Sequence, residues 1–511
     1  MGSETSGSAK KASRRSFIGG SVGIAATGAL APTLAAYADR RRRGKNRKSD
    51  VSPYGPLFPK KDATTGLPLL KLPRGFRYAS VGWTGDVMSD GTFTPDRHDG
   101  MAVVSAGRRP FRDVVLIRNH ERGGSDPDNP LPTVGAGQAP TYDPFALPGV
   151  LSGLGGGTTT MRFRHGRLIG DHASLAGTLT NCAGGPTPWG SWLTCEEVTI
   201  KGALLGAKDH GYVFEVPGPD LGVVATANPI RDMGLMDHEA VAVDPQTSFV
   251  YLTEDNGPNS GFYQFRPNNP AKRVGALEEG GELYMLKVKG VENADLINVE
   301  QGTRYDVEWV RVAEPEADPE GLEPPAPGFP PIAGVGKSGP FLQGEALGTA
   351  FFNRGEGCWY GNRRIYFVDT SGGPARSGVV WSYNPRRETL RALFVSPDSA
   401  TADNPDNITV SPSGGLLVCE DGSPQVDGTG AIVAGLRMLG INRDGSSYVF
   451  AENNLIIEEP LPGRPFIEPE DYRNREWAGA CFDPFGRFLF VNIQTPGVTF
   501  VIAGPWRRGP L

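Results

Sequence analysis

Acidic residues open and close pairs of short apolar runs at repeated places in the chain. In the clearest copy, Glu239 opens a run that ends at Asp244, and a second run from Phe249 ends in Glu254 and Asp255. The opening and closing residues of the other copies are Asp99 and Glu121, Cys182 and Glu197, Glu356 and Asp369, Asp406 and Glu420 with Asp421, and Glu476 and Gln494. Calcium and magnesium prefer carboxylate oxygens as ligands. The repeated acids therefore indicate a site that holds cations.

The apolar runs that carry these acids have the pattern of β-hairpins. Turns rich in glycine and proline join them, and the chain holds 70 glycines and 45 prolines among its 511 residues. The runs are almost wholly apolar rather than alternating, which favours strands covered on both faces. Six such hairpins predict an all-β fold, a β-propeller of six blades with long loop insertions.

A propeller would bring the repeated acids together, because the first residue of one strand and the last residue of the next lie at the same edge of a hairpin. These edges converge at one mouth of the central channel. Burying so many carboxylates without cations is unfavourable, so bound metal ions are expected. The alternative is that these acids are ordinary turn residues and strand-end caps and bind no metal. The expected metal ligands are Asp99, Glu121, Cys182, Glu197, Glu239, Glu254, Asp255, Glu356, Asp406, Glu420 and Asp421.

One cysteine stands apart from the other four. Cys182 lies in a turn that continues to Gly185, which makes it a candidate thiolate ligand. A thiolate among carboxylates points to a transition metal such as iron as well as to calcium. The other four cysteines lie in apolar, strand-like runs, and we expect them to be small buried hydrophobic residues. They are Cys195, Cys358, Cys419 and Cys481. An odd number of cysteines at wide spacing is a poor disulfide framework.

The N-terminal residues carry export signals. Arg14 and Arg15 form a twin-arginine signature, and a mildly apolar stretch then leads to an A-x-A-like cleavage site at 36–38. The twin-arginine (Tat) machinery is the expected partner in export, and the protein is expected in the periplasm, outside the cell or at its surface. The expected divisions are a signal peptide at 1–38, a basic flexible segment at 39–60, and a single catalytic propeller domain at 61–511 with an insertion at about 257–352.

Composition and motifs argue against several other classes of protein. Hydrophobic residues make up 38% of the chain and charged residues 21%, which is too apolar for wholesale disorder. The net charge of −6 argues against binding to nucleic acid. After the signal peptide, no stretch is apolar enough to span a membrane. The sequence has no G-x-S-x-G, P-loop or H-E-x-x-H motif. We expect a monomer.

Several motifs together resemble the PhoX family of alkaline phosphatases. The most specific is the stretch from Gly177 to Glu197, which contains Asn-Cys-Ala-Gly-Gly-Pro-Thr-Pro-Trp-Gly. The resemblance covers most of the chain after the signal peptide. Its other parts are the twin arginines, Asp237-His-Glu-Ala-Val, Arg354-Gly-Glu-Gly, Pro405-Asp-Asn and the late run Val-Asn-Ile-Gln-Thr-Pro-Gly ending at Gly497.

The resemblance implies a propeller phosphomonoesterase with a mixed cofactor of ferric and calcium ions (Fe³⁺ and Ca²⁺). It implies that Arg354 grips the substrate phosphate, and Arg354 and Glu356 are the expected catalytic residues. The metal ligands that it implies are Cys182, Glu197, Glu239 and Glu356. The family's late phosphate-binding lysine is missing, since no lysine follows Lys337. An arginine between 463 and 475 would have to replace it; otherwise phosphate binding is weaker or the substrate differs.

The leading hypothesis is an exported, metal-dependent alkaline phosphatase that releases phosphate from organic phosphate esters. A calcium-dependent lactonase or phosphodiesterase on a propeller is one alternative. A non-enzymatic exported propeller stabilised by calcium is another. His98, His120 and His238 each lie beside an expected mouth acid, and either ligand or acid–base roles or purely structural roles remain open for them.

Overall fold

The computed structural model describes residues 52–107, 113–125, 131–135, 137–147, 152–325 and 329–511. Asp50–Leu511 form one compact unit. The expected signal peptide and most of the expected basic segment lie outside the described residues. The last residues of that segment, Leu57–Lys60, form strand β1, because they pair with β2 (Leu70–Pro73).

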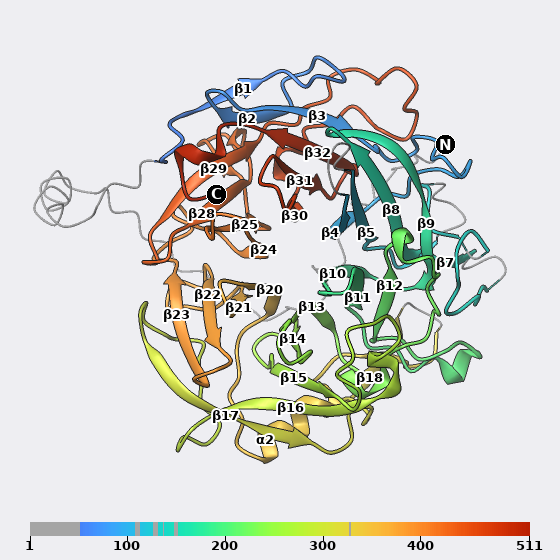
Figure 1. The fold of residues 1–511 in the computed structure, drawn as a ribbon, viewed down its shortest axis with the longest axis vertical. Helices are drawn as coiled ribbons and strands as arrows, with labels where there is room; N and C mark the ends of the chain where they lie inside the picture. The colour runs from blue at the N-terminus through green and yellow to red at the C-terminus, as the bar shows by residue number, and fades with distance from the viewer. Residues whose placement is uncertain (1–51, 108–112, 126–130, 136, 148–151, 326–328) are drawn as a thin grey trace, which may run out of the picture. The chain divides into compact units, whose positions relative to one another are not determined.

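Six inner strands form a closed ring (Figure 1). In order around the ring they are β4 (His98–Ala106), β10 (Asn181–Pro186), β13 (His238–Val243), β20 (Gly355–Gly361), β24 (Pro405–Val410) and β30 (Trp477–Phe482). Each inner strand contacts the next, and β30 contacts β4. The ring of radiating antiparallel strands confirms the predicted all-β propeller.

Each inner strand is followed by an antiparallel partner, and further strands extend the sheets outward. The second strands are β5 (Val114–His120), β11 (Ser191–Glu196), β14 (Val250–Glu254), β21 (Arg364–Asp369), β25 (Leu416–Glu420) and β31 (Phe488–Ile493). The third strands are β8 (Gly156–Arg164), β12 (Val213–Pro217), β15 (Phe262–Pro267), β22 (Val379–Asn384), β28 (Arg437–Ile441) and β32 (Val498–Ala503). The fourth strands are β9 (Arg167–Thr178), β16 (Gly281–Val288), β23 (Thr389–Val395), β29 (Ser447–Asn453) and β3 (Arg77–Val81).

The ends of the compact unit are joined within one sheet, because β3 pairs with β32 close to the C-terminus. A different link joins two other sheets: β17 (Arg304–Val312) pairs with both β16 and β23, which makes one nine-stranded sheet. Because this sheet contains two of the six inner hairpins, the hydrogen-bonded sheets do not correspond one to one with six blades. The number of blades therefore stays a prediction.

The segment 257–352, expected as an insertion, contains β15, β16 and β17. Its apolar runs continue the sheet that β13 and β14 begin, so that it is largely part of the propeller wall. It also holds β18 (Leu322–Glu323), β19 (Ala333–Gly334) and α2 (Gly339–Ala346). None of the helices in the described part of the chain is long and apolar enough to cross a membrane.

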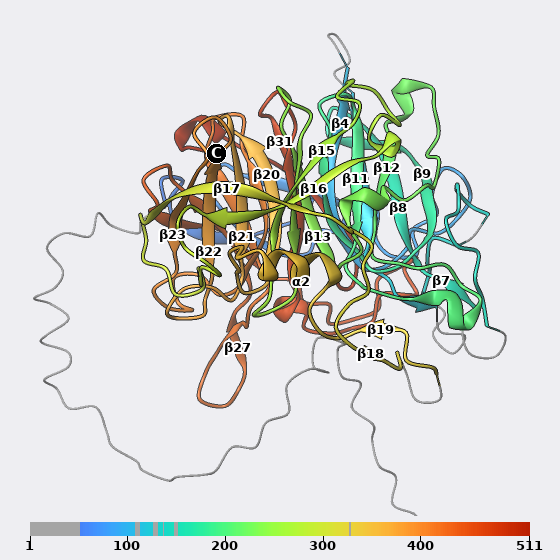
Figure 2. The ribbon, with the colours of Figure 1, turned by 90° about the horizontal axis from the view of Figure 1, so that it is seen from below.

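Small elements complete the fold. Figure 2 shows the β26–β27 and β18–β19 hairpins reaching out from one face of the ring. The short strands are β6 (Gly124–Ser125), β7 (Gly153–Leu154), β26 (Gln425–Val426) and β27 (Ile432–Ala434). The 3₁₀ helices are η2 (Gly202–Leu205), η3 (Pro219–Leu221), η4 (Arg231–Met233), η5 (Leu277–Glu279), η6 (Tyr472–Asn474) and η7 (Trp506–Arg508).

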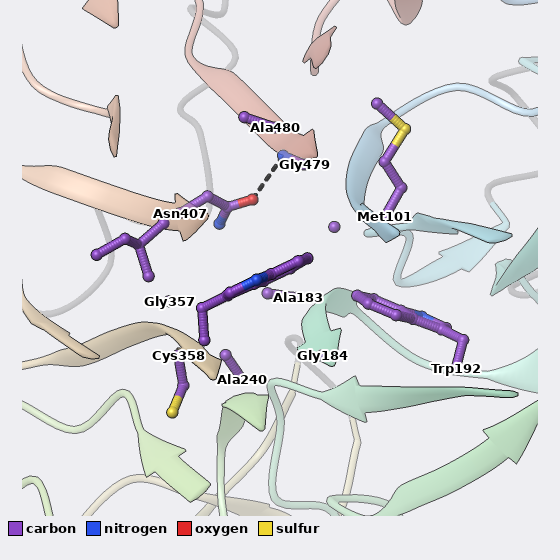
Figure 3. A pocket seen from close by; sticks show the side chains of 13 residues that line it. Met101, Ala183, Gly184, Trp192, Ala240, Gly357, Cys358, Asn407, Gly479 and Ala480 are labelled. Atoms are coloured by element: carbon purple, nitrogen blue, oxygen red, sulfur yellow. Dashed lines mark hydrogen bonds between the residues drawn. The ribbon is translucent and has the colours of Figure 1, made fainter. Parts of the chain in front are cut away.

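Residues from all six inner strands line a small cavity at the centre of the ring (Figure 3). Neighbouring inner strands approach closely: a Cβ atom on Gly185 would lie 1.9 Å from the carbonyl oxygen of Val241. The remaining cavity is about 10 Å³, which is room for about one water molecule. Residues that line it include Gly100, Ala183, Ala240, Gly357 and Asn407. A substrate must therefore reach the ring from one face rather than through its channel.

All six inner hairpins break their register near the start of the inner strand. In β13, for example, His238 pairs with Glu254, but the next regular pair is Val241 with Leu252. The same irregularity follows His98, Asn181, Gly355, Pro405 and Ala478. A β-bulge bends the strand and re-aims the side chains within it. The bulges therefore decide which side chains face the mouth of the ring.

Candidate metal centre

Five of the six bulges begin with a residue that can ligate a metal, directly after the last regular pair. These residues are Asp99, Cys182, Glu239, Glu356 and Asp406, and all five are buried. The sixth bulge has Gly479 at that place. Five equivalent backbone positions thus aim four carboxylates and one thiol at the same end of the ring.

The ligand atoms of nine side chains form four overlapping groups of three. Within each group, the ligand atoms all lie within 4.8 Å of one another. The groups are Cys182, Glu197 and Glu239; Glu239, Glu356 and Asp406; Asp406, Asp421 and Glu476; and Asp99, Glu121 and Glu476. Because Glu239, Asp406 and Glu476 each belong to two groups, the four form one continuous cluster that could hold several metal ions.

Backbone alternation decides which of two consecutive acids faces this cluster. Adjacent side chains of an extended strand point to opposite sides. Glu197 and Asp421, one residue beyond the ends of β11 and β25, belong to the cluster, whereas Glu196 and Glu420 point into their own sheets. The sequence pattern contained both members of each pair, and the direction of each depends on where the strand ends.

Three expected ligands are engaged elsewhere. Glu254 accepts hydrogen bonds from the Gly261 N–H at 3.1 Å and the Tyr263 hydroxyl at 2.6 Å. Glu420 is held by the guanidinium of Arg437, with Nη2 to Oε1 at 2.6 Å. Asp255 binds Arg354. None of these three carboxylates belongs to a group of candidate ligands among the described residues.

Electrostatics at the centre of the cluster favour bound cations. Glu239 is buried, and its Oε2 has no hydrogen-bond partner in the described part of the chain. Burial raises the pKa of Glu239 well above its usual range, and the charges of Glu356 and Glu197 raise it further. Burial, with Glu239 next, likewise raises the pKa of the Cys182 thiol. A multivalent cation would reverse these penalties and stabilise the ionised ligands, so the residues fit a metal cluster.

Arg354 lies beside the cluster and is fixed in place. Its Nε donates to Asp255 Oδ1 at 2.9 Å and its Nη2 to Asp255 Oδ2 at 2.7 Å, while Nη2 also reaches Glu356 Oε1 at 2.8 Å. Its backbone has φ +67°, a left-handed conformation uncommon for arginine. The side chain is 29% exposed, so the guanidinium is partly open at the mouth.

Two mouth residues were not among the expected site residues. Glu476, which opens the sixth copy of the sequence pattern but was not among the expected metal ligands, closes the cluster from a position three residues before its bulge. Arg97 precedes β4 as Arg354 precedes β20, and it too has a positive φ, 51°. Its Nη1 donates to Gln494 Oε1 at 2.9 Å. The Gln494 amide in turn donates to Glu121 and Glu476. A sequence signal for Arg97 was present, because it stands two residues before Asp99, as Arg354 stands two residues before Glu356.

The late arginines pair with carboxylates outside the candidate ligand groups of the described residues. Arg464 pairs with Asp86 at 2.9 Å, and Arg473 pairs with Asp471 at 2.7 Å. Arg475 pairs with Glu470 at 2.7 Å. None of these three partner carboxylates belongs to a candidate ligand group among the described residues.

The three histidines beside the mouth acids are buried in the walls of the ring. His98 and His238 contact the backbone carbonyls of Pro95 and Gly234 through their Nε2 atoms. His120 contacts the carbonyl of Asp96 and the hydroxyl of Thr159. Burial lowers the pKa of all three, that of His238 to about 4. None belongs to a candidate ligand group among the described residues, so their contacts are those of neutral structural side chains.

A fourth histidine supports Glu197 indirectly. His210 Nδ1 lies 2.7 Å from Glu196 Oε1, and Glu196 also accepts the N–H groups of Leu179 and Gly211 at 2.9 Å. Both residues are buried. Burial alone lowers the pKa of His210, but the charges of Glu196 and Asp143 outweigh it and raise the pKa to about 9. This buried ion pair anchors the backbone on both sides of Glu197.

We expect the His210 ion pair to make stability depend on pH. A raised pKa means that protonated His210 stabilises the fold fully below its unfolded pKa near 6.5, and that this contribution is lost as pH rises to about 9. The loss should be roughly 3 kcal/mol. Denaturant unfolding at pH 6.5 and pH 9 should show this loss in the native protein and not in His210→Gln. The same change at the exposed His172 should leave the loss intact; an equal loss in His210→Gln would contradict the assignment.

The fold and the site together define a β-propeller with a candidate metal centre at its mouth. A family model described as "Alkaline phosphatase PhoX" matches residues 52–144 and 144–497. The chain therefore belongs to the PhoX family of alkaline phosphatases, as its motifs predicted, and it is a phosphatase.

One solved structure supports the propeller fold. Pseudomonas fluorescens PhoX in complex with vanadate, a transition-state analogue, is 15% identical, with 88% of this chain and 98% of that chain covered and a TM-score of 0.59. A gluconolactonase from Xanthomonas campestris covers 89% of this chain and 99% of its own, at 13% identity and a TM-score of 0.34. TolB from Acinetobacter baumannii is 10% identical, with 68% and 60% covered and a TM-score of 0.31. No curated protein gives a significant match.

Proposed function

We propose that the protein is an exported, metal-dependent phosphomonoesterase that takes phosphate from organic esters. The observation that carries the proposal is the continuous cluster of nine ligand side chains beside a fixed, partly open arginine. A phosphate monoester dianion needs concentrated positive charge to bind and to react. Bound metal ions would supply that charge and an activated oxygen nucleophile.

The donor set suggests which ion each group would take. Cys182 offers the one sulfur ligand, so its group with Glu197 and Glu239 is the candidate for iron. The other three groups contain carboxylates alone and suit calcium. Glu239 belongs to both kinds of group and would hold the two metals next to each other.

The protein's own cations would orient the ester. Arg354 presents a planar fork that matches two oxygens of a phosphate group, and Asp255 holds that fork in one orientation. Glu356 would serve the metals and also fix Arg354 Nη2. A substrate would not pass through the ring, because the cavity at its centre is only about 10 Å³.

We further propose Arg97 as the second contact to the phosphate, in place of the missing late lysine. It is tied to the group of Asp99, Glu121 and Glu476 through Gln494. Arg97→Ala should raise KM for a phosphate monoester about tenfold, since a hydrogen bond to a charged group contributes about 1.5–3 kcal/mol. Steady-state kinetics should show no such rise for Arg475→Ala, whose guanidinium binds Glu470. The opposite ranking would assign the role to Arg475.

Export through the Tat pathway is proposed from Arg14 and Arg15. The expected compartments are the periplasm, the cell surface and the medium. A protein folded before export would carry its metals with it.

The proposed function predicts hydrolysis of p-nitrophenyl phosphate by protein purified from its export compartment. Chelation should abolish the activity, because the metal ions would supply the positive charge that the phosphate group needs, and added calcium and iron should restore it. Turnover of a phosphodiester or a lactone should be slower under the same conditions. Faster lactone than monoester turnover, or full activity after complete removal of metal, would contradict the proposal.

A further inference from the structure

A cleft of about 820 Å³ lies at the other end of the strands that carry the mouth residues. Strand β20 runs from Gly355, beside the candidate metal centre, to Gly361, which leads into the cleft wall. The turns between β20 and β21, β22 and β23, and β28 and β29 all contribute lining residues. The cleft is thus remote from the mouth, and its size is that of a small-molecule site.

The lining of this cleft is strongly basic. Six arginines line it: Arg304, Arg363, Arg364, Arg387, Arg391 and Arg443. One carboxylate, Asp306, accompanies them. The chain as a whole has a net charge of −6, so this concentration of positive charge runs against its composition. Within the described ranges, no salt bridge joins any of the six to a carboxylate.

Two of these arginines face each other across a strand pair. Arg304 on β17 stands directly opposite Arg391 on β23, in the pairing that joins two sheets. Like charges directly opposite in an antiparallel pair destabilise it. The Arg391 Nε is also buried without a hydrogen-bond partner in the described part of the chain. An anion bound between the two guanidinium groups would relieve their repulsion and accept a hydrogen bond from the Arg391 Nε.

Arg363 is presented in a strained conformation. Asn362 and Arg363 have φ values of 53° and 59° in the tight turn between β20 and β21. Such turns favour Asn followed by Gly, because both central residues need a positive φ. An arginine in the place where glycine is preferred keeps a long cationic side chain on the cleft at some cost in stability.

We propose that this cleft binds a soluble, multiply charged anion with several phosphate or sulfate groups. Guanidinium forks match two oxygens of such tetrahedral groups. Several arginines arranged around one concave surface suit a compact ligand with several such groups better than a single phosphate. The site differs from the mouth in chemistry as well as in place, because it has arginines where the mouth has carboxylates.

The test is calorimetric titration of the metal-loaded, full-length protein with sucrose octasulfate, which carries no phosphate ester. The cleft variant is Arg304→Gln, Arg363→Gln and Arg391→Gln together. The control is Arg231→Gln, Arg273→Gln and Arg311→Gln, which removes the same charge from exposed ion pairs with Glu316, Glu279 and Glu282.

We expect the native protein to bind one probe molecule, the control to bind within threefold of it, and the cleft variant to bind at least tenfold more weakly. Hydrolysis of p-nitrophenyl phosphate should be unchanged in the cleft variant, which separates this proposal from the function of the mouth. Equal binding by all three proteins, or equal weakening in both variants, would overturn it. Cleft-dependent binding to anionic lipid vesicles, without binding to the probe, would overturn the choice of a soluble ligand.

Arg391→Gln alone should raise Tm without probe, because it removes a like-charge pair.

Discussion

Replacing Glu239 by glutamine should remove metal and activity together. Glu239 belongs to two of the four ligand groups, and its Oε2 is buried without a hydrogen-bond partner among the described residues. A neutral amide is a much weaker ligand for calcium or iron than a carboxylate. We expect kcat to fall at least about 1000-fold, or about 4 kcal/mol. Metal analysis of the variant should show loss of both metals.

Glu254→Gln is the matched control for this change. Glu254 is as deeply buried as Glu239 and closes the same hairpin, and its Oε1 is also without a hydrogen-bond partner among the described residues. Its Oε2, however, accepts hydrogen bonds from Gly261 and Tyr263, and Glu254 belongs to none of the ligand groups there. The variant should lose stability and keep its metal and its kcat. If Glu254→Gln lost metal and Glu239→Gln kept it, the assignment of mouth-facing residues would be wrong.

Replacing Arg354 by alanine should weaken substrate binding without removing metal. The guanidinium is bound by Asp255 and Glu356 and is partly open at the mouth. Losing its charge-assisted hydrogen bonds to a phosphate dianion should lower kcat/KM about 100-fold, chiefly through KM. The inhibition constant for free phosphate should rise by a similar factor. Arg354→Lys should recover only part of this loss, because an ammonium keeps the charge and lacks the fork.

Arg473 provides the control for Arg354, because it makes the same fork. Its Nε and Nη2 lie 2.9 Å and 2.7 Å from the two oxygens of Asp471, as those of Arg354 do from Asp255. Arg473→Ala should leave kcat/KM within a few-fold of the native value. If the Arg354→Ala variant kept the native KM and the native inhibition constant for phosphate, the Arg354 guanidinium would only hold Glu356 in position and would not bind the substrate.

The sequence was sufficient to predict the strands and the gathering of acids. Runs such as Leu416–Glu420 and Val250–Glu254 are strands, because three or four consecutive apolar residues bounded by turns have few other stable forms. The similarity of the hairpins then led to a ring. The run that begins at Phe262 carries the same signal, and its strand lay inside the segment expected as an insertion.

The direction of each acid was harder to predict than its place. Glu420 and Asp421 are neighbours in sequence, yet one binds Arg437 and the other joins the cluster. Side chains alternate in direction along a strand, so a shift of one residue decides whether an acid faces the cluster or its own sheet. The bulge at the start of each inner strand adds one residue and changes this alternation again. Glu476 opens the sixth copy of the sequence pattern but stands three residues before its bulge, and Arg97 lies outside the repeated positions.

Elemental analysis of the protein purified from its export compartment, with no metal added, tests the central claim most directly. The account predicts iron and calcium in near-integer ratios to the chain, with more than one calcium ion, and their loss from Glu239→Gln. Calcium without iron in a fully active protein would contradict the role of Cys182. An active protein with neither metal would contradict the metal centre itself.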